Sequence, residues 1–429
     1  MKNRLALVLA SALAALMIPS LWAAGPVNLV IPHYKAGQNV GAKFFLPQVE
    51  RFNKKYAGVY SIAVQELPQD SYNDKMKQLA QQNKLPALVE GGDKQWFEQV
   101  MIANDKVLDL GPWLDGHPAV KSLCIDDALT FNTQNGKVVS LPLAVTRPIG
   151  LFYNETMFKP GKGVGAMSFD EFSKALGKNK IAFMTSENAW TTGLFLTALI
   201  VGEPGGAAML RAGFKDRVYD YSGPIWLSAV AKLQKYLRDY ATGNTLGAAY
   251  ADAANAFMSR SAAIIANGSW MAGDFAAGSE NKWSGGFAGS QARGDVYPGN
   301  AAIDNVMIYR WWIPSSATKD EQAAALAFLE FMSTPAELEA YMLAEGGTAP
   351  KLKASKEFLA KQAENRILND LAIAVNAKTT ITVSVYDVMP PSVGNVEFGK
   401  LLPKLMDGSF TPAQFLSELG KKAKETKLD

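Results

Sequence analysis

The stretch VNLVIPHYKAGQNVGAKFFLPQVERFNKKYAGVYSIAVQEL, residues 27–67, decides the fold class. It begins with a short apolar run that breaks at Pro32, which is typical of the end of a strand. In the next segment Phe45 and Val49 recur at helical spacing, and residues 60–67 then alternate between apolar and polar side chains. The stretch therefore predicts a strand, a helix and a second strand in succession.

The alternation of strands and helices continues beyond this stretch. Tyr72 and Met76 mark a further helix, and residues 85–90 (LPALVE) form a strand closed by a pair of glycines. Such a pattern predicts an α/β fold with a mainly parallel sheet, in which ligands bind at the carboxyl ends of the strands. Polar and aromatic side chains gather at two of these ends, HYK at 33–35 and EGGDKQW at 90–96.

Later segments carry clear helix signals. Ser168 and Glu171 have the spacing of a capping box, which predicts that a helix starts there. Residues 224–240 place apolar side chains such as Val230 and Leu237 on one face, as an amphipathic helix does. Residues 136–158 predict two extended segments joined through Thr146, Arg147 and Pro148.

The length and the N-terminus bound the organisation of the chain. At 429 residues it exceeds one ordinary core, so we expect two domains or one composite unit. Residues 1–24 combine Lys2 and Arg4, an apolar run and small residues before a cut after Ala23 or Ala24, which predicts a cleaved secretory signal. An uncleaved membrane anchor is the alternative, disfavoured because the run is short and interrupted by proline.

Charge and cysteine content argue against several classes of partner. Removing Lys2 and Arg4 from the 43 basic side chains leaves 41 against 40 acidic ones, a net charge of +1 that indicates no nucleic-acid partner. Cys124 is the only cysteine, so no disulfide framework or lipid attachment site is expected, and with two histidines in the chain we expect no metal and no cofactor. Export and the absence of an anchor point to a free periplasmic protein.

Tryptophans stand at two predicted helix starts. In AIIANGSWMAGDF, residues 263–275, an apolar strand leads through an Asn267–Gly268 turn to Ser269, a helix cap, and then to Trp270. The segment ENAWTTG repeats this arrangement, with Glu187 and Trp190 in the first turn of an apolar helix. Large apolar rings at such positions are accessible to ligands at a strand end.

Several stretches together resemble one family. They occur in the same order as in the sugar-type extracellular solute-binding proteins of ABC importers. The stretches are NLVIPHYKAG (28–37), FLPQVERFNKKYAGVYSIAVQE (45–66), NKLPALVEGGD (83–93), GKVVSLPLAVTRPIGLFYNETMF (136–158), FMSRSAAIIANGSW (257–270) and AALAFLEFMSTPAELEAYMLAEGGTAPKLKAS (324–355). No single one is specific, but their common order is hard to obtain by chance.

The resemblance implies a two-lobed periplasmic-binding-protein fold with a hinge and a ligand cleft between the lobes. On the family's pattern, residues 25–144 and 287–332 form the first lobe, and residues 145–286 and 333–429 form the second. The implied protein is a monomer without catalytic activity. It captures a carbohydrate and delivers it to the transmembrane subunits of an ABC permease.

The resemblance also implies site residues. Sugars present apolar C–H faces as well as hydroxyls, so an aromatic ring can cover the former while polar neighbours bond the latter. Trp270 matches a family tryptophan that stacks on sugar. The other expected contacts are Glu187 and Trp190 in the second lobe, Asp93, His33, Tyr34 and Lys35 in the first, and Arg147 in the hinge. His33 has an equal claim to a structural role, and Arg147 either faces the ligand or pairs with a carboxylate across the hinge.

Two departures from the family's pattern leave the sugar's identity open. Trp311 and Trp312 are adjacent, so in a strand they point to opposite faces and at most one faces the cleft, with Trp311 as our candidate. In the region 379–398, Tyr386 or Phe398 takes the place of a further family aromatic.

Other functions remain open at this point. A polyol phosphate or another anionic ligand on the same fold would use Arg147, Lys35 and helix N-termini. A secreted carbohydrate hydrolase would need two positioned carboxylates, for which Asp93 and Glu187 are poor candidates on opposite lobes. A ferric-ion binder would have to use tyrosine ligands, since the chain lacks a clustered metal-ligand motif.

Overall fold

The computed structural model describes residues 25–364 and 366–426, and the predicted signal segment 1–24 lies outside them. Its first elements are the expected strand, helix and strand, β1 (Val27–His33), α1 (Ala42–Lys55) and β2 (Tyr60–Glu66). Because α1 buries Phe45, Val49 and Phe52, it packs against the parallel pair β1 and β2 and fixes their common face.

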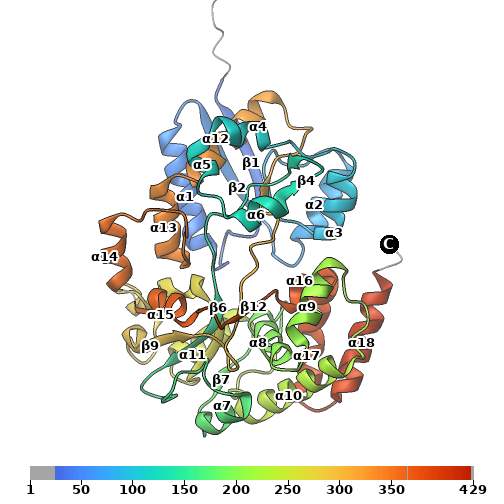
Figure 1. Cartoon of the computed structure of the whole chain (residues 1–429), viewed down its shortest axis with the longest axis vertical. Helices are drawn as coiled ribbons and strands as arrows, with labels where there is room; N and C mark the ends of the chain where they lie inside the picture. The colour runs from blue at the N-terminus through green and yellow to red at the C-terminus, as the bar shows by residue number, and fades with distance from the viewer. Residues whose placement is uncertain (1–24, 365, 427–429) are drawn as a thin grey trace, which may run out of the picture.

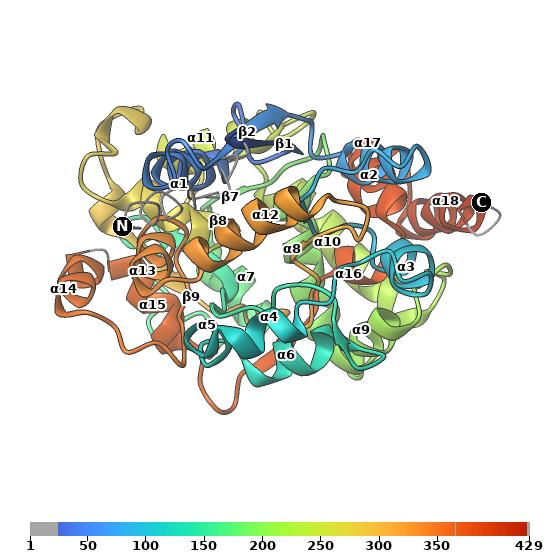
Figure 2. The same cartoon turned by 90° about the horizontal axis from the view of Figure 1, so that it is seen from above.

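The upper lobe of Figure 1 grows from this unit. Its remaining elements are α2 (Tyr72–Gln81), β3 (Val89–Glu90), α3 (Lys94–Trp96), η1 (Phe97–Ile102), α4 (Gly111–Gly116), α5 (Pro118–Lys121), α6 (Asp126–Asn132), β4 (Thr133–Gln134), β5 (Lys137–Val138), β11 (Trp311–Trp312) and α12 (Lys319–Met332). The strand β11 pairs antiparallel with β3, and α12 packs on β1. Figure 2 shows α12 crossing the middle of the upper lobe, with β1 and β2 to one side of it.

The lower lobe contains the largest sheet. Its elements before the return to the upper lobe are β6 (Ile149–Asn154), α7 (Phe169–Leu176), β7 (Ile181–Ala182), α8 (Trp190–Val201), α9 (Gly206–Lys215), α10 (Pro224–Tyr240), α11 (Tyr250–Met258), β8 (Ile264–Gly268), η2 (Ser269–Phe275), η3 (Glu280–Lys282), η4 (Gly289–Gln291), β9 (Ala292–Asp295) and β10 (Ala301–Ile303). The helix α13 (Pro335–Glu345) contacts both α1 and η2 and links the lobes. The elements after it are α14 (Lys356–Glu364), α15 (Arg366–Ala374), β12 (Thr380–Thr382), α16 (Val385–Val388), η5 (Val393–Glu397), α17 (Phe398–Met406) and α18 (Pro412–Glu425).

This sheet corrects the prediction of a mainly parallel one. Its order is β12-β10-β6-β8-β7, and β9 also pairs with β6. The central strand β6 runs antiparallel to β8, β9 and β10, whereas the outer pairs β10–β12 and β7–β8 are parallel. The sheet is mixed because β6 enters from the upper lobe, in the direction opposite to the strands that follow local helices.

The structure confirms the predictions for two helices and corrects the one at the end of β8. The capping box of Ser168 and Glu171 is confirmed, as is the buried face of α10. The predicted turn and cap before Trp270 are wrong, because Asn267 and Gly268 complete β8 by pairing with β6, and Ser269 begins a 3-10 helix without capping it. Strand pairing here prevails over the local turn preference of Asn-Gly.

The chain crosses between the lobes at residues 142–148, 304–310 and 333–348, and Figure 1 shows the first two side by side at the centre. The backbone of Thr146 in the first crossover bonds that of Thr348 in the last. The predicted return to the first lobe at residue 287 differs from this arrangement. The strands β9 and β10 pair with β6 of the lower lobe, so the return begins after Ile303.

Each lobe has its own core. One apolar cluster fills the lower lobe around Phe152, and a second fills the upper lobe around Phe52. Among the described residues no single helix is long and apolar enough to cross a membrane. Two helices, Trp190–Val201 and Gly206–Lys215, reach that length and composition only as a pair bent by 120°.

Candidate functional site

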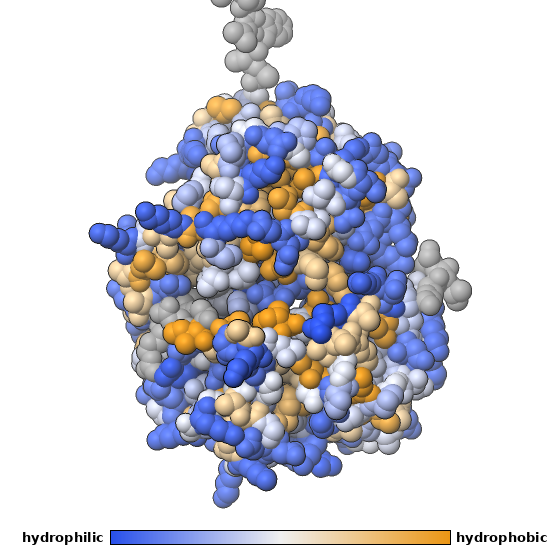
Figure 3. All heavy atoms as spheres, in the orientation of Figure 1, coloured by the Kyte–Doolittle hydropathy of each residue, from blue (hydrophilic) through white to orange (hydrophobic). Residues whose placement is uncertain are grey.

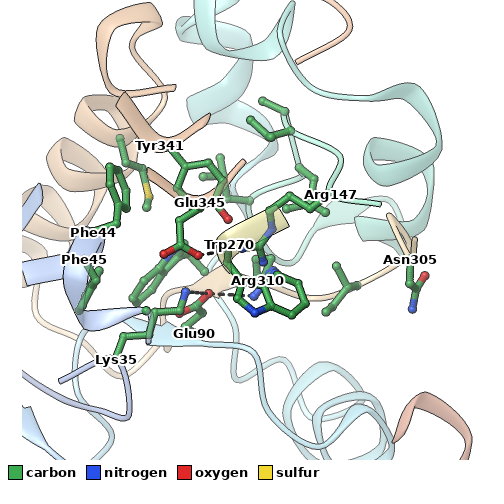
Figure 4. A pocket seen from close by; sticks show the side chains of 18 of the residues that line it. Lys35, Phe44, Phe45, Glu90, Arg147, Trp270, Asn305, Arg310, Tyr341 and Glu345 are labelled. Atoms are coloured by element: carbon green, nitrogen blue, oxygen red, sulfur yellow. Dashed lines mark hydrogen bonds and ion pairs between the residues drawn. The ribbon is translucent and has the colours of Figure 1, made fainter. Parts of the chain in front are cut away.

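Two neighbouring cavities lie between the lobes, and Figure 3 shows the surface hollowed there. The first has a volume of about 300 Å³. It is enclosed by α1, the first two crossovers, the start of η2 and the helix α13. Figure 4 shows its polar side chains converging, among them Lys35, Glu90, Arg147, Arg310 and Glu345, around Trp270 and Tyr341.

A buried carboxylate, Glu90, organises the upper wall of this cavity. Lys35 Nζ lies 2.8 Å and Arg310 Nη1 3.0 Å from its Oε1, while His33 Nε2 lies 2.8 Å from its Oε2. Burial alone would raise the pKa of Glu90, but the adjacent Lys35, His33 and Arg310 hold the pKa well below its ordinary value. Glu90 is therefore an anion at neutral pH, and its partners are His33 at the end of β1, Lys35 just after it and Arg310 at the end of the crossover 304–310.

His33 has the structural role that the sequence left open. Its ring is fully buried and lies stacked on Trp311 and Tyr34, with centroids 5.3 and 4.6 Å away. Its Nδ1 accepts a hydrogen bond from the backbone N–H of Lys35, so Nε2 carries the proton toward Glu90. Burial lowers the pKa of His33 although Glu90 raises it, which favours the neutral ring. His33 orients Glu90 and does not line either cavity.

The lower wall pairs Arg147 with Glu345 at the end of α13. Arg147 Nη1 lies 3.1 Å from Glu345 Oε2, and its guanidinium stacks over the rings of Trp270 and Tyr341 at 5.4 and 5.3 Å. Burial raises the pKa of Glu345, although the charge of Arg147 lowers it. Arg147 thus lines the first cavity while it also pairs with a carboxylate across the hinge.

Trp270 can take its position at the cavity because the residue two before it is a glycine. The indole lies directly over Gly268, where an added Cβ would stand 2.1 Å from a ring atom. Behind it, Trp190 lies 5.7 Å from the Trp270 ring and 4.8 Å from that of Tyr250. Trp190 therefore supports Trp270 from below and does not line the cavity.

The charges of the first cavity nearly cancel. Its cations are Lys35, Arg147 and Arg310, and its carboxylates are Glu90, Glu345, Asp304 and Asp387. Burial raises the pKa of Asp304 to about 6, against the lowering effect of a hydrogen bond from the Arg147 backbone. The cavity therefore offers charged donors and acceptors without a surplus of positive charge.

Asp93 is occupied by a contact between the lobes. Its Oδ1 caps α3 by accepting from the backbone N–H groups of Gln95 and Trp96, and also accepts from Arg217 Nη2 of the lower lobe at 2.8 Å. Lys77 Nζ lies 3.2 Å from Oδ2. Burial would raise the pKa of Asp93, yet Arg217 and Lys77 lower it. These partners leave little of the carboxylate for the sugar hydroxyls that the sequence predicted.

The cleft is bridged on its other side as well. Lys43 of α1 lies 2.6 Å from the carboxylate of Asp274 in η2. Next to Asp93, the Tyr219 hydroxyl of the lower lobe donates to Gln95 of the upper lobe at 3.2 Å. Ion pairs between the lobes therefore flank the cavities on both sides.

The second cavity, of about 250 Å³, lies beyond the crossover 304–310. Tyr34, Asp93, Arg217 and Tyr386 line it. The Tyr386 hydroxyl donates to the backbone carbonyl of Asn188, and burial raises the pKa of Tyr386 well above its usual value.

The remaining predicted residues separate into two groups. Trp311 lines the first cavity, whereas Trp312 packs in a different cluster and donates from Nε1 to the Gly91 carbonyl. Glu187 is exposed, lines neither cavity and accepts from the backbone N–H of Tyr250 at 3.4 Å. Phe398 is fully buried in the lower core, so of the two late aromatics it is Tyr386 that reaches the cleft.

Sequence reasoning missed four residues of the first cavity: Glu90, Arg310, Tyr341 and Glu345. Glu90 stood inside the quoted EGGDKQW, but a charge at a strand end does not reveal that it is buried. Glu345 and Tyr341 share a helix within the stretch 324–355, which was quoted only for its family resemblance. The pair Gly346–Gly347 after this helix was the available signal of a close approach.

Comparisons with known proteins agree with this architecture. The model of a family described as bacterial extracellular solute-binding protein matches residues 48–366. No curated protein sequence matches the chain at a significant level.

Solved structures with the same fold are distant in sequence. A chitin oligosaccharide binding protein has a TM-score of 0.71 at 17% identity, over 94% of this chain and 100% of its own. A Streptococcus pneumoniae solute-binding protein in complex with the blood group A-trisaccharide has a TM-score of 0.68 at 16% identity, over 93% and 100%. The protein RafE in complex with raffinose has 0.68 at 18%, over 92% and 98%. At these identities the likeness concerns the two-lobed fold alone.

Proposed function

The chain belongs to the family of bacterial extracellular solute-binding proteins, and on this basis we propose that it is the substrate-binding component of an ABC importer. It captures a neutral carbohydrate between its two lobes, which close around it, and delivers it to the permease in the membrane. It acts as a monomer in the periplasm after cleavage of residues 1–24. No chemical step is required of it, because capture and release are changes of conformation.

The observation that carries this proposal is the composition of the first cavity. Trp270 and Tyr341 offer aromatic surface beside the Arg147 guanidinium that stacks on them, and such surface suits the C–H faces of a sugar ring. Around them, the pairs Arg147–Glu345 and Lys35–Glu90 present donors and acceptors side by side. A sugar hydroxyl donates and accepts at once, so it fits between the members of such a pair.

The same pairs favour a neutral ligand over an anionic one. Lys35, Arg147 and Arg310 each lie within 3.1 Å of a carboxylate. A phosphate or carboxylate ligand would have to displace one of these buried partners and leave it unpaired, which is costly. The polyol-phosphate alternative therefore has less support than a neutral saccharide.

A hydrolase receives no support from the carboxylates predicted for it. Asp93 is paired across the lobes, and Glu187 lies outside both cavities. No group of three His, Cys, Asp or Glu side chains that could hold a metal ion occurs in the described part of the chain. The tyrosine-based ferric alternative is tested by the ferric salts in the assay below.

The proposal is tested by thermal shift of residues 25–429 against neutral mono- and oligosaccharides, uronic acids, polyols, sugar phosphates and ferric salts. A ligand that binds only the folded protein raises its melting temperature. We expect a shift with a neutral saccharide, and a shift confined to anions or ferric salts would refute the proposed ligand class.

Titration calorimetry with the saccharide that gives the shift then tests the site. Trp270→Ala should weaken binding by about 1–3 kcal/mol, the scale of one buried aromatic contact. The matched control is Trp113→Ala, because Trp113 is also partly buried but lines neither cavity. Equal affinities of the two variants would remove Trp270 from the site.

A further inference from the structure

The second cavity differs from the first because some of its polar side chains have no hydrogen-bond partner among the described residues. In the first cavity each of the three cations pairs with a carboxylate. In the second, three polar side chains are free of such contacts: Tyr34, Asn73 and Asn395 line it, and none of their side chains hydrogen-bonds another described residue. These three groups are thus available to a bound molecule.

The uncommitted groups come from both lobes. Tyr34 follows β1 and Asn73 belongs to α2, both in the upper lobe, whereas Asn395 lies in η5 of the lower lobe. Primary amides and phenol hydroxyls both donate and accept, which is the pattern that ring hydroxyls require. A molecule held by all three would contact both lobes.

Apolar surface accompanies these groups. Phe131 of the upper lobe and Phe214 of the lower lobe line the same cavity, with their rings 6.0 Å apart. They offer the apolar contact that a sugar ring needs beside its hydroxyl partners.

The cations that line the second cavity already have partners in the protein, as those of the first cavity do. Arg217 pairs with Asp93 and donates to the Met389 carbonyl, and Lys94 lies over the Phe214 ring and near Glu98. An anion would therefore meet no uncommitted cation among the described residues that line this cavity. The available chemistry is that of a neutral polyhydroxyl group.

The two cavities are neighbours. They share lining residues, among them Glu90, Asn305 and Arg310, so they adjoin along these side chains. The buried Nε of Arg310, at this junction, has no hydrogen-bond partner among the described residues. A buried donor without a partner is costly, so a bound acceptor at this position would be favourable.

From these observations we infer that the second cavity binds a further ring of the same carbohydrate, so that the ligand is a neutral oligosaccharide of at least two rings. One ring lies against Trp270 in the first cavity. The next meets Tyr34, Asn73 and Asn395 in the second, with an oxygen near Arg310 between them. The inference rests on the proposed function, since it concerns the length of the carbohydrate that the cleft holds.

The test is titration calorimetry of residues 25–429 with size series from one to four rings: glucose with maltose to maltotetraose, and the corresponding cello-, xylo- and N-acetylchito-oligosaccharides. In the series that binds, we expect the affinity to rise at least tenfold from one ring to two or three. Asn395→Ala should lower the affinity for the longer members about tenfold and leave that for the single ring unchanged. Tyr34→Phe, which removes only the hydroxyl, should act in the same direction.

Controls separate this inference from the proposed function. Asn281→Ala removes an exposed amide outside both cavities and should change no affinity. Trp270→Ala should weaken all lengths. A single ring that binds as tightly as longer members, or an Asn395→Ala variant that weakens every length alike or none, would overturn the inference while the sugar-binding function stands. Wild-type protein that binds no saccharide of any length would overturn both.

Discussion

Removing one side chain that bridges the lobes should open the cleft. Arg217→Ala deletes the partner of Asp93 across the cleft, where the two charged groups lie 2.8 Å apart and their side chains are 12% and 8% exposed. Breaking a buried ion pair costs about 3–5 kcal/mol when the remaining charge is left alone. Asp93 is not left alone, because Lys77 lies 3.2 Å from it and two backbone N–H groups of α3 donate to it.

Arg217→Ala should therefore cost less free energy than a substitution that leaves a buried charge alone. A hydrogen bond to a charged group contributes about 1.5–3 kcal/mol, and we take about 1–2 kcal/mol for this compensated pair. The closed state should lose that amount relative to the open state, a factor of about 5–30 in their ratio. Lys43–Asp274 and Gln95–Tyr219 remain to bridge the lobes, so the variant should shift the equilibrium without abolishing closure.

Small-angle X-ray scattering of the ligand-free protein measures this shift as an increase in the radius of gyration. The dissociation rate of a bound saccharide should rise by a similar factor. Arg238→Ala is the matched control, because Arg238 is 69% exposed and, among the described residues, forms an ion pair only with its neighbour Asp239. A double-mutant cycle with Asp93→Asn isolates the pair. A coupling energy near zero, or an Arg217→Ala protein that scatters as the wild type does, would refute the reasoning.

Three further predictions concern Gly268, Asp304 and Cys124. Gly268→Ala should weaken saccharide binding as Trp270→Ala does, since the added Cβ would stand 2.1 Å from the indole and displace it; unchanged affinity by calorimetry would show that the ring adapts. The pKa of Asp304, about 6, lies above its ordinary 3.8, so the folded state binds this proton more tightly and stability falls as pH rises through this window. Asp304→Asn should therefore raise the melting temperature more at pH 7.5 than at pH 4.5, and equal shifts in calorimetric scans would contradict this. Cys124 is 2% exposed, and burial raises its pKa to about 11, so a thiol reagent should label it only in denaturant; rapid labelling of the native protein would exclude the packed role.

Particular residues show how much of the fold could be predicted from the sequence. The pattern of Phe45 and Val49 predicted α1 because helical spacing is a local property that packing against β1 then reinforces. The direction of β6 was not predictable in this way, because it depends on the point at which the chain crosses between the lobes. The Asn267–Gly268 turn failed for a related reason, since pairing with β6 extends β8 through both residues.

The candidate site, too, could be predicted only in part from local sequence. Trp270 was predictable because it follows a strand end, and the structure places it at the first cavity. Its neighbours Glu345 and Tyr341 come from the other end of the chain, and only the third crossover brings them there. Glu187 satisfied the same local pattern as Trp270 but lies outside both cavities. The prediction failed because no spacing along the sequence tells which side of a helix start faces the opposite lobe.

The position of Asp93 shows why a single carboxylate cannot be assigned from its place after a strand. Its backbone setting, as the cap of α3, is fixed by local sequence. Its contact with Arg217, by contrast, comes from the other lobe. If the lobes separate, Asp93 keeps Lys77 and its capping bonds and loses only the partner that spans the cleft. Under the proposed function, such a carboxylate would act on ligand affinity through the closed state. The groups that would recognise the ligand are those that hydrogen-bond no other described residue: the indole of Trp270 and, beyond the crossover 304–310, the amides of Asn73 and Asn395.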